Sequence, residues 1–190
     1  MTTPRERRYR IREQQIIDHA RRIAEAEGWS AVSTRRLAQE IDHSQPVIYQ
    51  HFRNREHVVA AVVRQGFAEL TELIREHAQQ ADAPLESLCW SYLNFSWQNP
   101  ALYEAMFTRP TALEFAAENT PAELRDSFEA LVEVIGNEAG MKTYDDAAAL
   151  TEFFWAACHG LASLHLAGRI PARQDQVARL CGMIRIYSSE

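Results

Sequence analysis

The chain has 190 residues, of which 46% are hydrophobic and 24% charged, and its net charge is −6, as is typical of a protein that folds into one or two domains around buried cores. Membrane and secretory classes are disfavoured: the least polar long run, residues 153–168, is too short to span a bilayer, and no apolar stretch follows the basic N-terminal segment. Three cysteines without close spacing, Cys89, Cys158 and Cys181, fit a reducing cytoplasm better than a disulfide scaffold. We therefore expect a cytoplasmic globular protein.

The charge is distributed unevenly along the chain. Residues 1–60 hold 11 Arg and 8 acidic residues, giving +3, whereas residues 61–190 hold 9 basic and 18 acidic residues, giving −9. The basic residues are densest at the start, at Arg5, Arg7, Arg8, Arg10 and Arg12. A basic end on an acidic body indicates either an anionic partner for that end or a solvated face with chance clustering.

Helix start and stop signals follow one another through the first 80 residues. Thr3 to Glu6 has the form of a capping box with Pro at the first helical position, and the pattern continues to Gly28, a natural stop. Ser33 and Ser44 are positioned to cap two short helices over residues 34–41 and 45–51. Asn54 is positioned to cap a long helix that reaches about Gln80.

The same punctuation continues to the C-terminal end. Asn99-Pro100 starts a short helix, and a second capping box over residues 120–123 opens a helix that Gly140 closes. Thr143 with Asp146 opens the next helix, which ends at Gly168, and Pro171 begins the last one. Sustained alternation and hairpin turns are nearly absent. We predict an all-α fold of about nine helices, with an N-terminal three-helix domain at 1–53 and a C-terminal helical bundle at 54–190.

Residues 33–52, STRRLAQEIDHSQPVIYQHF, predict two short helices joined by three residues. Leu37, Ala38 and Ile41 share one face of the first helix, while Ile48 and Phe52 are spaced to pack back onto it. This arrangement matches a helix-turn-helix, whose second helix enters the major groove of DNA. The alternative is an ordinary helical corner whose polar residues face water.

The outward side chains have the chemistry of a DNA-binding surface. Gln45 can read a base edge with paired hydrogen bonds, and Val47 offers an apolar surface to a thymine methyl group. The remaining candidates suit phosphate oxygens through their hydroxyl, imidazole or guanidinium groups, or through backbone amides near a helix start: Thr34, Arg35, Tyr49, His51 and Arg55.

The segment STRRLAQEIDHSQPVIYQHFRNREHVV resembles the DNA-binding segment of TetR-family transcriptional regulators, and the resemblance covers about residues 10–65. It implies that Gln45, Pro46 and Val47 face bases, and that the phosphate candidates hold the backbone. Asp42 stands where the family usually has Gly; Asp tolerates a left-handed backbone, though less readily. Val47 stands where small or hydroxyl residues are common, which leaves the base preference open at that position.

The segment FFWAACHGLASLHLAGRIP resembles the C-terminal domain named for its Trp-His-Gly signature, which a subset of TetR-like regulators carries; the three residues here are Trp155, His159 and Gly160. Aromatic stripes at helical spacing are usually core, yet a helical bundle with bulky rings and a few polar groups can enclose an apolar cavity. The candidate effector-pocket residues are Trp90, Asn94, Trp97, Tyr103, Phe107, Trp155 and His159. The acidic body favours neutral or cationic effectors.

The sequence therefore predicts a homodimeric TetR-like transcription regulator, most simply a repressor that a small molecule releases from a near-palindromic operator on double-stranded DNA. The resemblance implies a dimer interface formed by the last two helices, whose small residues Ala157, Gly160 and Ser163 permit close approach. A helical adaptor protein without ligand control is the first alternative, and an enzyme the second. Metal-ligand spacings and Gly-rich phosphate loops are lacking, so we expect no catalytic residues, no cofactor, no metal and no membrane partner.

Overall fold

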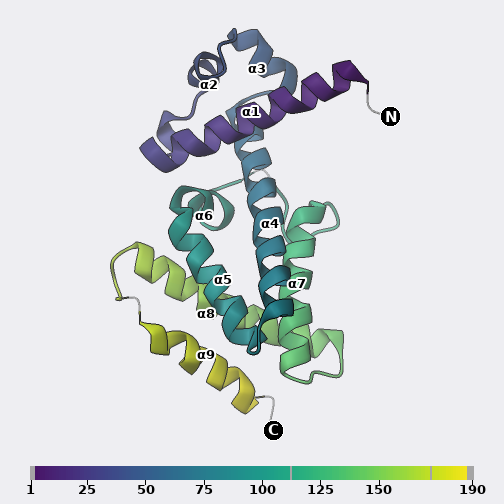
Figure 1. The fold of residues 1–190 in the computed structure, drawn as a ribbon, viewed down its shortest axis with the longest axis vertical. Coiled ribbons are helices and arrows are strands. Elements are labelled where there is room, and N and C mark those ends of the chain that lie inside the picture. The colour runs from purple at the N-terminus through teal and green to yellow at the C-terminus, as the bar shows by residue number, and fades with distance from the viewer. Residues whose placement is uncertain (1–2, 112, 172, 188–190) are drawn as a thin grey trace. The chain divides into compact units, whose positions relative to one another are not determined.

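The structure is a computed structural model that describes residues 3–111, 113–171 and 173–187. Residues 1–2 of the predicted domain 1–53 lie outside it, as do residues 112, 172 and 188–190 of the predicted domain 54–190. The all-α prediction is confirmed: the described residues form nine α-helices and one 3₁₀-helix (Figure 1). In chain order they are α1 Pro4–Glu27, η1 Trp29–Ala31, α2 Thr34–Glu40, α3 Gln45–His51, α4 Arg55–Gln80, α5 Pro84–Gln98, α6 Pro100–Phe107, α7 Ala122–Glu138, α8 Tyr144–Leu166 and α9 Gln174–Tyr187.

Three of the long helices begin where a capping side chain accepts backbone N–H groups that the first turn leaves without partners. The Thr3 hydroxyl accepts from the Glu6 N–H at 3.2 Å, and the Glu6 carboxylate accepts from the Thr3 N–H at 2.8 Å, which completes the predicted capping box. Asn54 accepts from the His57 N–H at 3.0 Å, and Thr143 from the Asp146 N–H at 3.2 Å. Local capping chemistry thus sets the starts of α1, α4 and α8.

Two local details differ from the sequence prediction. The 3₁₀-helix η1 follows Gly28 and was not predicted, because a single tight turn has no periodic signal. The last helix begins at Gln174 and not near Pro171. Its Gln176 side chain turns back instead, accepting from the Arg173 N–H at 3.2 Å and donating to the Pro171 carbonyl at 3.4 Å. These bonds stabilise a non-helical backbone just before α9.

The chain divides into two compact units, each described here by itself. The first unit is Met1–Gly66 with Asn99–Pro121, so it contains α1, α2, α3, the start of α4, and α6. Polar contacts from the C-terminal part of α1 and from η1 hold α6. The Glu25 carboxylate accepts from the backbone N–H groups of Ala101 and Leu102 at 3.0 and 2.9 Å, and the Trp29 indole donates to the Ala101 carbonyl at 2.7 Å.

The second unit is Phe67–Gln98 with Ala122–Glu190, in which α7 packs on α8, and α5 contacts α7, α8 and α9. Arg185 of α9 forms a two-pronged ion pair with Glu86 of α5, at 2.6 and 2.7 Å. This ion pair joins the last helix to α5. Across the described part of the chain, no helix combines the length and the apolar character needed to cross a membrane.

The three cysteines, which are far apart in sequence, are buried in the second unit as free thiols. The Sγ atoms of Cys89 and Cys158 lie 3.6 Å apart. The hydrogen bond with Cys89, together with burial, raises the pKa of Cys158 well above its usual range, and burial raises the pKa of Cys181 to about 12. Both thiols therefore stay protonated at neutral pH.

Candidate nucleic-acid interface

Buried apolar residues fix the angle between α2 and α3. Leu37 and Ile48 are fully buried, and Phe52 is nearly so, as the spacing of these residues predicts. The turn between the helices contains Asp42 at φ 53°, which confirms the left-handed backbone expected at this position. The His43 N–H then donates to the Ala38 carbonyl at 2.9 Å, closing the end of α2.

The start of α3 is linked to the start of α2 by side-chain hydrogen bonds. The Gln45 amide donates to the Thr34 hydroxyl at 2.8 Å, and the Tyr49 hydroxyl lies 3.4 Å from the same oxygen. Gln45, Pro46 and Arg35 are exposed, whereas Thr34 and Val47 are half-buried. Tyr49 is 52% exposed, which is high for a large aromatic side chain.

His51 is less exposed than its position on the outward side of α3 predicts. Its ring packs against Tyr9 of α1 with centroids 4.1 Å apart, and the Tyr9 hydroxyl donates to the Gln50 carbonyl at 3.1 Å. Burial lowers the pKa of His51; Glu13 raises it and Arg12 lowers it to smaller extents. Its Nδ1 is buried, with no hydrogen-bond partner among the described residues. Sequence reasoning missed Tyr9, because nothing local indicates a contact between residues more than forty positions apart.

Arg55, predicted to hold phosphate, makes contacts within the protein. Its guanidinium donates to the Trp29 carbonyl at 2.6 Å and to the Val32 carbonyl at 2.8 Å, and it pairs with Glu56 at 3.0 Å. These bonds anchor η1 and the residue that follows it to the start of α4. Arg55 therefore stabilises the segment that precedes α2.

The predicted effector residues on α5 fall into two groups. Trp90 and Trp97 lie near each other, with ring centroids 6.3 Å apart, while Asn94 is exposed. The ring beside Trp97 belongs to His165, at 4.8 Å, and not to His159. The Trp97 Nε1 and the His165 Nδ1 are both buried, without a hydrogen-bond partner among the described residues. His165 is therefore a candidate that the sequence reasoning did not select.

The other predicted effector residues have different neighbours. The Trp155 indole donates to the Tyr92 hydroxyl at 3.1 Å, and His159 interacts with the Ser163 hydroxyl at 3.3 Å. Burial lowers the pKa of His159. Tyr103 and Phe107 belong to the first unit, where their rings contact each other at 4.7 Å.

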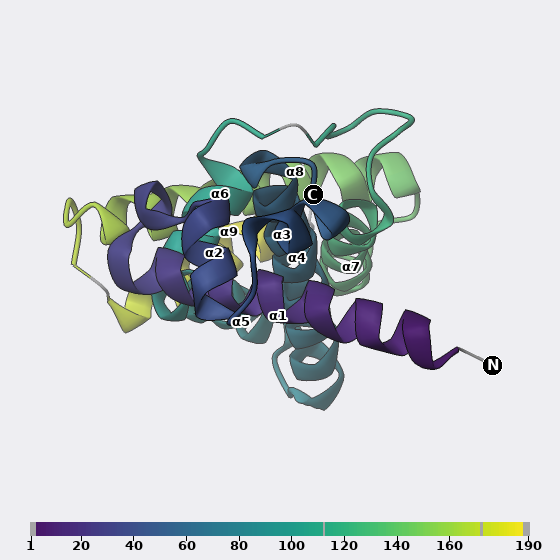
Figure 2. The same cartoon turned by 90° about the horizontal axis from the view of Figure 1, so that it is seen from above.

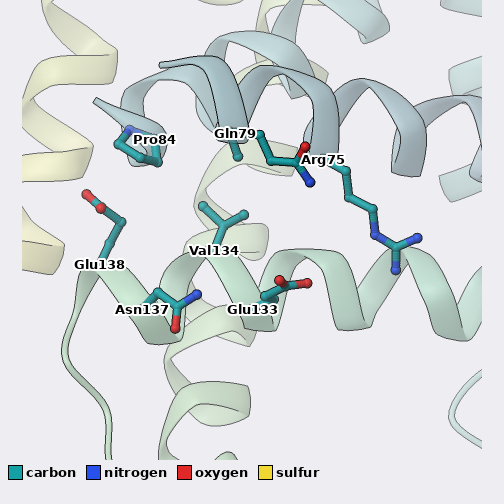
Figure 3. A pocket seen from close by; sticks show the side chains of 8 residues that line it. Arg75, Gln79, Pro84, Glu133, Val134, Asn137 and Glu138 are labelled. Atoms are coloured by element: carbon teal, nitrogen blue, oxygen red, sulfur yellow. The ribbon is translucent and has the colours of Figure 1, made fainter. Parts of the chain in front are cut away.

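A surface hollow of about 350 Å³ lies in the second unit, and none of the predicted effector residues lines it (Figure 3). Side chains of α4 and α7 face each other across it, and Pro84 lies at one end. Its polar lining combines a guanidinium, carboxylates and amides. The lining residues are Arg75, Ala78, Gln79, Pro84, Glu133, Val134, Asn137 and Glu138.

The arrangement of α2 and α3 defines a helix-turn-helix DNA-binding protein. One face of α2 is buried, a three-residue turn follows, and α3 exposes Gln and Tyr side chains. Comparison with known families identifies the type. The family described as "Bacterial regulatory proteins, tetR family" matches residues 16–62, and the family described as "Tetracyclin repressor-like, C-terminal domain" matches residues 85–184, more than half of the chain. The protein belongs to the TetR family of DNA-binding transcriptional regulators. Membership of this family decides against the enzymatic alternative.

Two curated relatives match parts of the chain. An uncharacterised helix-turn-helix regulator, YobS of Bacillus subtilis, is 27% identical over 97 residues, which cover 50% of this chain and 51% of the relative. The transcriptional repressor AcnR of Corynebacterium diphtheriae is 30% identical over 67 residues, 35% of each chain. The matched region thus spans about half and about a third of these relatives.

Solved structures share the whole fold at low sequence identity. A protein of unknown function from Rhodococcus sp. RHA1 has a TM-score of 0.74 at 23% identity, covering 94% of both chains. The fatty acid degradation regulator FadR of Bacillus halodurans has a TM-score of 0.69 at 16% identity, covering 97% of this chain and 96% of its own. A TetR-family regulator from Streptomyces coelicolor has a TM-score of 0.65 at 17% identity, covering 94% and 98%.

Proposed function

We propose that the protein is a homodimeric repressor that binds a near-palindromic operator and leaves it when a small molecule binds. Residues 1–53 contact DNA in this proposal, and residues 54–190 bind the ligand and form the dimer. The observation that carries it is the exposed surface of Gln45, Pro46 and Tyr49 on a short helix whose opposite side is buried. A polar helix face held rigidly in this way suits insertion into the major groove.

Gln45, Pro46 and Val47 would face base edges, and Thr34, Arg35, Tyr49 and His51 would hold phosphates. In the free protein the Gln45 amide donates to Thr34, so binding to a base exchanges one hydrogen bond for another. Because this hydrogen bond to Thr34 already restrains the Gln45 side chain, little side-chain entropy remains to be lost. Arg55 would contribute mainly by holding the segment before α2, through its bonds to two carbonyls.

An apolar stripe on α8 supports the dimer proposal. Phe153, Ala157, Gly160 and Leu164 recur at a helical spacing, so they share one face of α8. Phe153 is 76% exposed and Leu164 45%, and a Cβ added at Gly160 would meet nothing within 4 Å. On α9, Met183 is 67% exposed. Large apolar side chains flanking small ones fit the close packing of one helix against another across a two-fold axis.

The effector proposal rests on the aromatic residues of α5 and α8. Trp97 and His165 bring two buried nitrogen atoms without partners next to aromatic rings, a combination that suits a small ligand with a few polar groups. Assignment to the Trp-His-Gly subset belongs to this proposal too, with Trp155 and His159 as its residues. A ligand that binds one conformation of the dimer better than the other would shift the population away from the DNA-binding form.

The DNA proposal is tested by selecting duplexes from a randomised library with the unmodified protein and then measuring the affinity of variants. Gln45→Ala is expected to reduce discrimination at one base pair by about 1–3 kcal/mol, while Tyr49→Phe weakens binding to all duplexes alike. Unchanged discrimination in Gln45→Ala would show that this residue does not read a base.

The dimer proposal is tested by sedimentation velocity at micromolar protein concentration. Phe153→Glu places a charge within the proposed interface and is expected to convert the dimer to a monomer. Ile11→Glu is the matched control, because Ile11 is 50% exposed on α1 and lies outside that stripe. An unmodified protein that sediments as a monomer would contradict both the dimer and the palindromic operator.

The effector site is tested with compounds that release the selected duplex from the protein. If the aromatic residues bind the effector, Trp97→Phe weakens release because it removes the indole N–H, while Arg75→Ala in the hollow leaves release unchanged. The reverse result would move the effector site to the hollow between α4 and α7.

A further inference from the structure

The first twelve residues of α1, Pro4 to Gln15, precede its first buried residue, Ile16. We name this segment the α1 arm. Residues 4–11 are all exposed, and at 1.5 Å per residue the arm is about 18 Å long. The reciprocal capping bonds between Thr3 and Glu6 satisfy backbone N–H groups at its tip and stabilise the helix there. The arm is thus a capped helix that lacks a buried face of its own.

Tyr9 joins the α1 arm to the last turn of α3. Its hydroxyl donates to the Gln50 carbonyl at 3.1 Å, and its ring packs on His51 at 4.1 Å. The arm therefore passes the C-terminal end of the base-reading helix, and its tip continues beyond α3 (Figure 2). A helix in the major groove has phosphate backbone beside its ends, so a segment held there lies near phosphates that α3 itself does not contact.

The basic side chains of the arm are sorted by face. At 100° per residue, Arg5, Arg8 and Arg12 fall within about 60° of one another, and Tyr9 lies about 70° from the centre of that stripe. Arg7 and Arg10 fall more than about 100° from the centre of that stripe. Among the described residues no ion pair joins Arg5 or Arg8 to an acidic side chain, although Arg22 and Arg36 farther along the chain pair with Glu40 at 2.6 and 2.9 Å.

Arg12 connects this stripe to the site already described. Its Nε is buried, as is the Nδ1 of His51, and neither has a hydrogen-bond partner within the described part of the chain. Buried side-chain nitrogens at the junction of α1 and α3 suit an anion site, in which the other N–H groups of the Arg12 guanidinium bind the anion. The stripe lacks large apolar residues apart from Tyr9, which favours a polyanion over a membrane surface.

We propose that Arg5, Arg8 and Arg12 bind phosphates of the duplex that flanks the base pairs read by α3. The inference rests on the proposed docking of α3 in the major groove. It extends the DNA-contacting surface beyond the helix-turn-helix, and it accounts for the concentration of arginine at one end of an acidic protein. Because phosphates carry no sequence information directly, the arm raises affinity for flanking DNA without changing which bases are preferred.

The experiment compares two double variants that remove equal charge: Arg5→Ala with Arg8→Ala on the proposed face, and Arg7→Ala with Arg10→Ala on the opposite side. The probe is the duplex selected from a randomised library by the unmodified protein, prepared with long flanks and with flanks shortened by half a helical turn. Affinity is measured by fluorescence anisotropy over a fourfold range of salt. Circular dichroism verifies that both variants remain folded.

Each phosphate contact contributes about 0.9 to the slope of log affinity against log salt. Losing two contacts per protomer lowers that slope by about 1.8. For each protomer, a fourfold rise in salt then reduces the affinity of the variant by a factor about twelvefold smaller than for the unmodified protein. We expect this change in the Arg5/Arg8 variant and a much smaller one in the Arg7/Arg10 variant. Shortened flanks should weaken the unmodified protein and leave the Arg5/Arg8 variant nearly unaffected.

Equal slopes in the two double variants would overturn the inference, since the arginines would then act only through a diffuse field. Equal affinity of the unmodified protein for long and shortened flanks would overturn it as well. Both results leave the proposed function intact, because a sequence has still been selected. If no sequence is enriched, the proposed function fails, and this inference fails with it.

Discussion

Glu25 lies near the C-terminal end of α1 and provides the N-terminal cap of a different helix. Asn99, the residue before α6, makes no side-chain capping bond of its own, and its amide oxygen instead accepts from Arg21 at 2.8 Å. The Glu25 carboxylate takes the place of a local cap, accepting from the Ala101 and Leu102 N–H groups at 3.0 and 2.9 Å in a partly buried position. A carboxylate there also interacts favourably with the α6 dipole.

We predict that Glu25→Ala lowers the free energy of unfolding by about 2–3 kcal/mol. A hydrogen bond to a charged group contributes about 1.5–3 kcal/mol, but the two bonds share one carboxylate, and water can reach the partly exposed site after the substitution. Glu25→Gln should cost about half as much, because the amide oxygen keeps one acceptor and loses the charge. The bond from the Trp29 indole to the Ala101 carbonyl remains in both variants.

The assay is urea denaturation followed by circular dichroism at one fixed protein concentration. With a slope near 2 kcal/mol per molar urea, Glu25→Ala should move the midpoint down by about 1–1.5 M with the slope unchanged. Asp18→Ala is the matched control: it removes the same charge from α1 but breaks only an exposed bond with Gln14. If the two alanine variants agree within about 0.5 kcal/mol, the assigned capping role of Glu25 is refuted.

Three further perturbations test other parts of the first unit. Gly66→Ala should lower the free energy of unfolding by about 1 kcal/mol in urea denaturation. The added Cβ would lie 2.7 Å from Met106 and 2.8 Å from Leu102, and this crowding costs more than the gain in helix propensity. A more stable variant would contradict this prediction. Asp42→Gly should raise the melting temperature slightly, since glycine adopts φ 53° without strain; a lower value would show that the carboxylate contributes more than the strain costs. Burial lowers the pKa of His51 from its ordinary value of 6.5, so the folded protein favours the neutral ring. The contribution of His51 to the free energy of unfolding is therefore complete above that pH and is lost as the pH falls below it. His51→Gln should flatten this part of a stability–pH profile, and an unchanged profile would exclude His51 as the source of the pH dependence.

Local sequence signals were sufficient for the starts of α1, α4 and α8, although they missed η1 and placed the start of α9 too early. Thr3, Asn54 and Thr143 could be read as caps, because a cap bonds to backbone three residues away and so leaves a signature in a short stretch. The inward positions Leu37 and Ile48 follow from helical periodicity in the same way. The three-residue turn then predicted the helix-turn-helix arrangement of α2 and α3, and the family resemblance supported it.

The contacts missed by sequence reasoning join residues far apart in the chain. Tyr9 on His51 and Cys89 beside Cys158 depend on how helices cross, which no local spacing encodes. His159 was preferred to His165 from the signature, but the His165 ring packs on Trp97. Arg55 was selected as a phosphate contact, which stays a prediction, and its bonds to two backbone carbonyls are a further role that no local spacing indicates.

The membership of α6 in the first compact unit affects how this protein can be recombined with its relatives. A chimaeric regulator spliced near residue 54 would pair the α1 of one parent with the α6 of another, and Glu25 and Trp29 would then meet a foreign backbone. Exchanging residues up to Gly66 together with Asn99–Pro121 would keep donors and acceptors from one parent. A graft of this DNA-binding specificity that keeps these contacts therefore needs two exchanged segments, separated in the sequence by the rest of α4 and by α5.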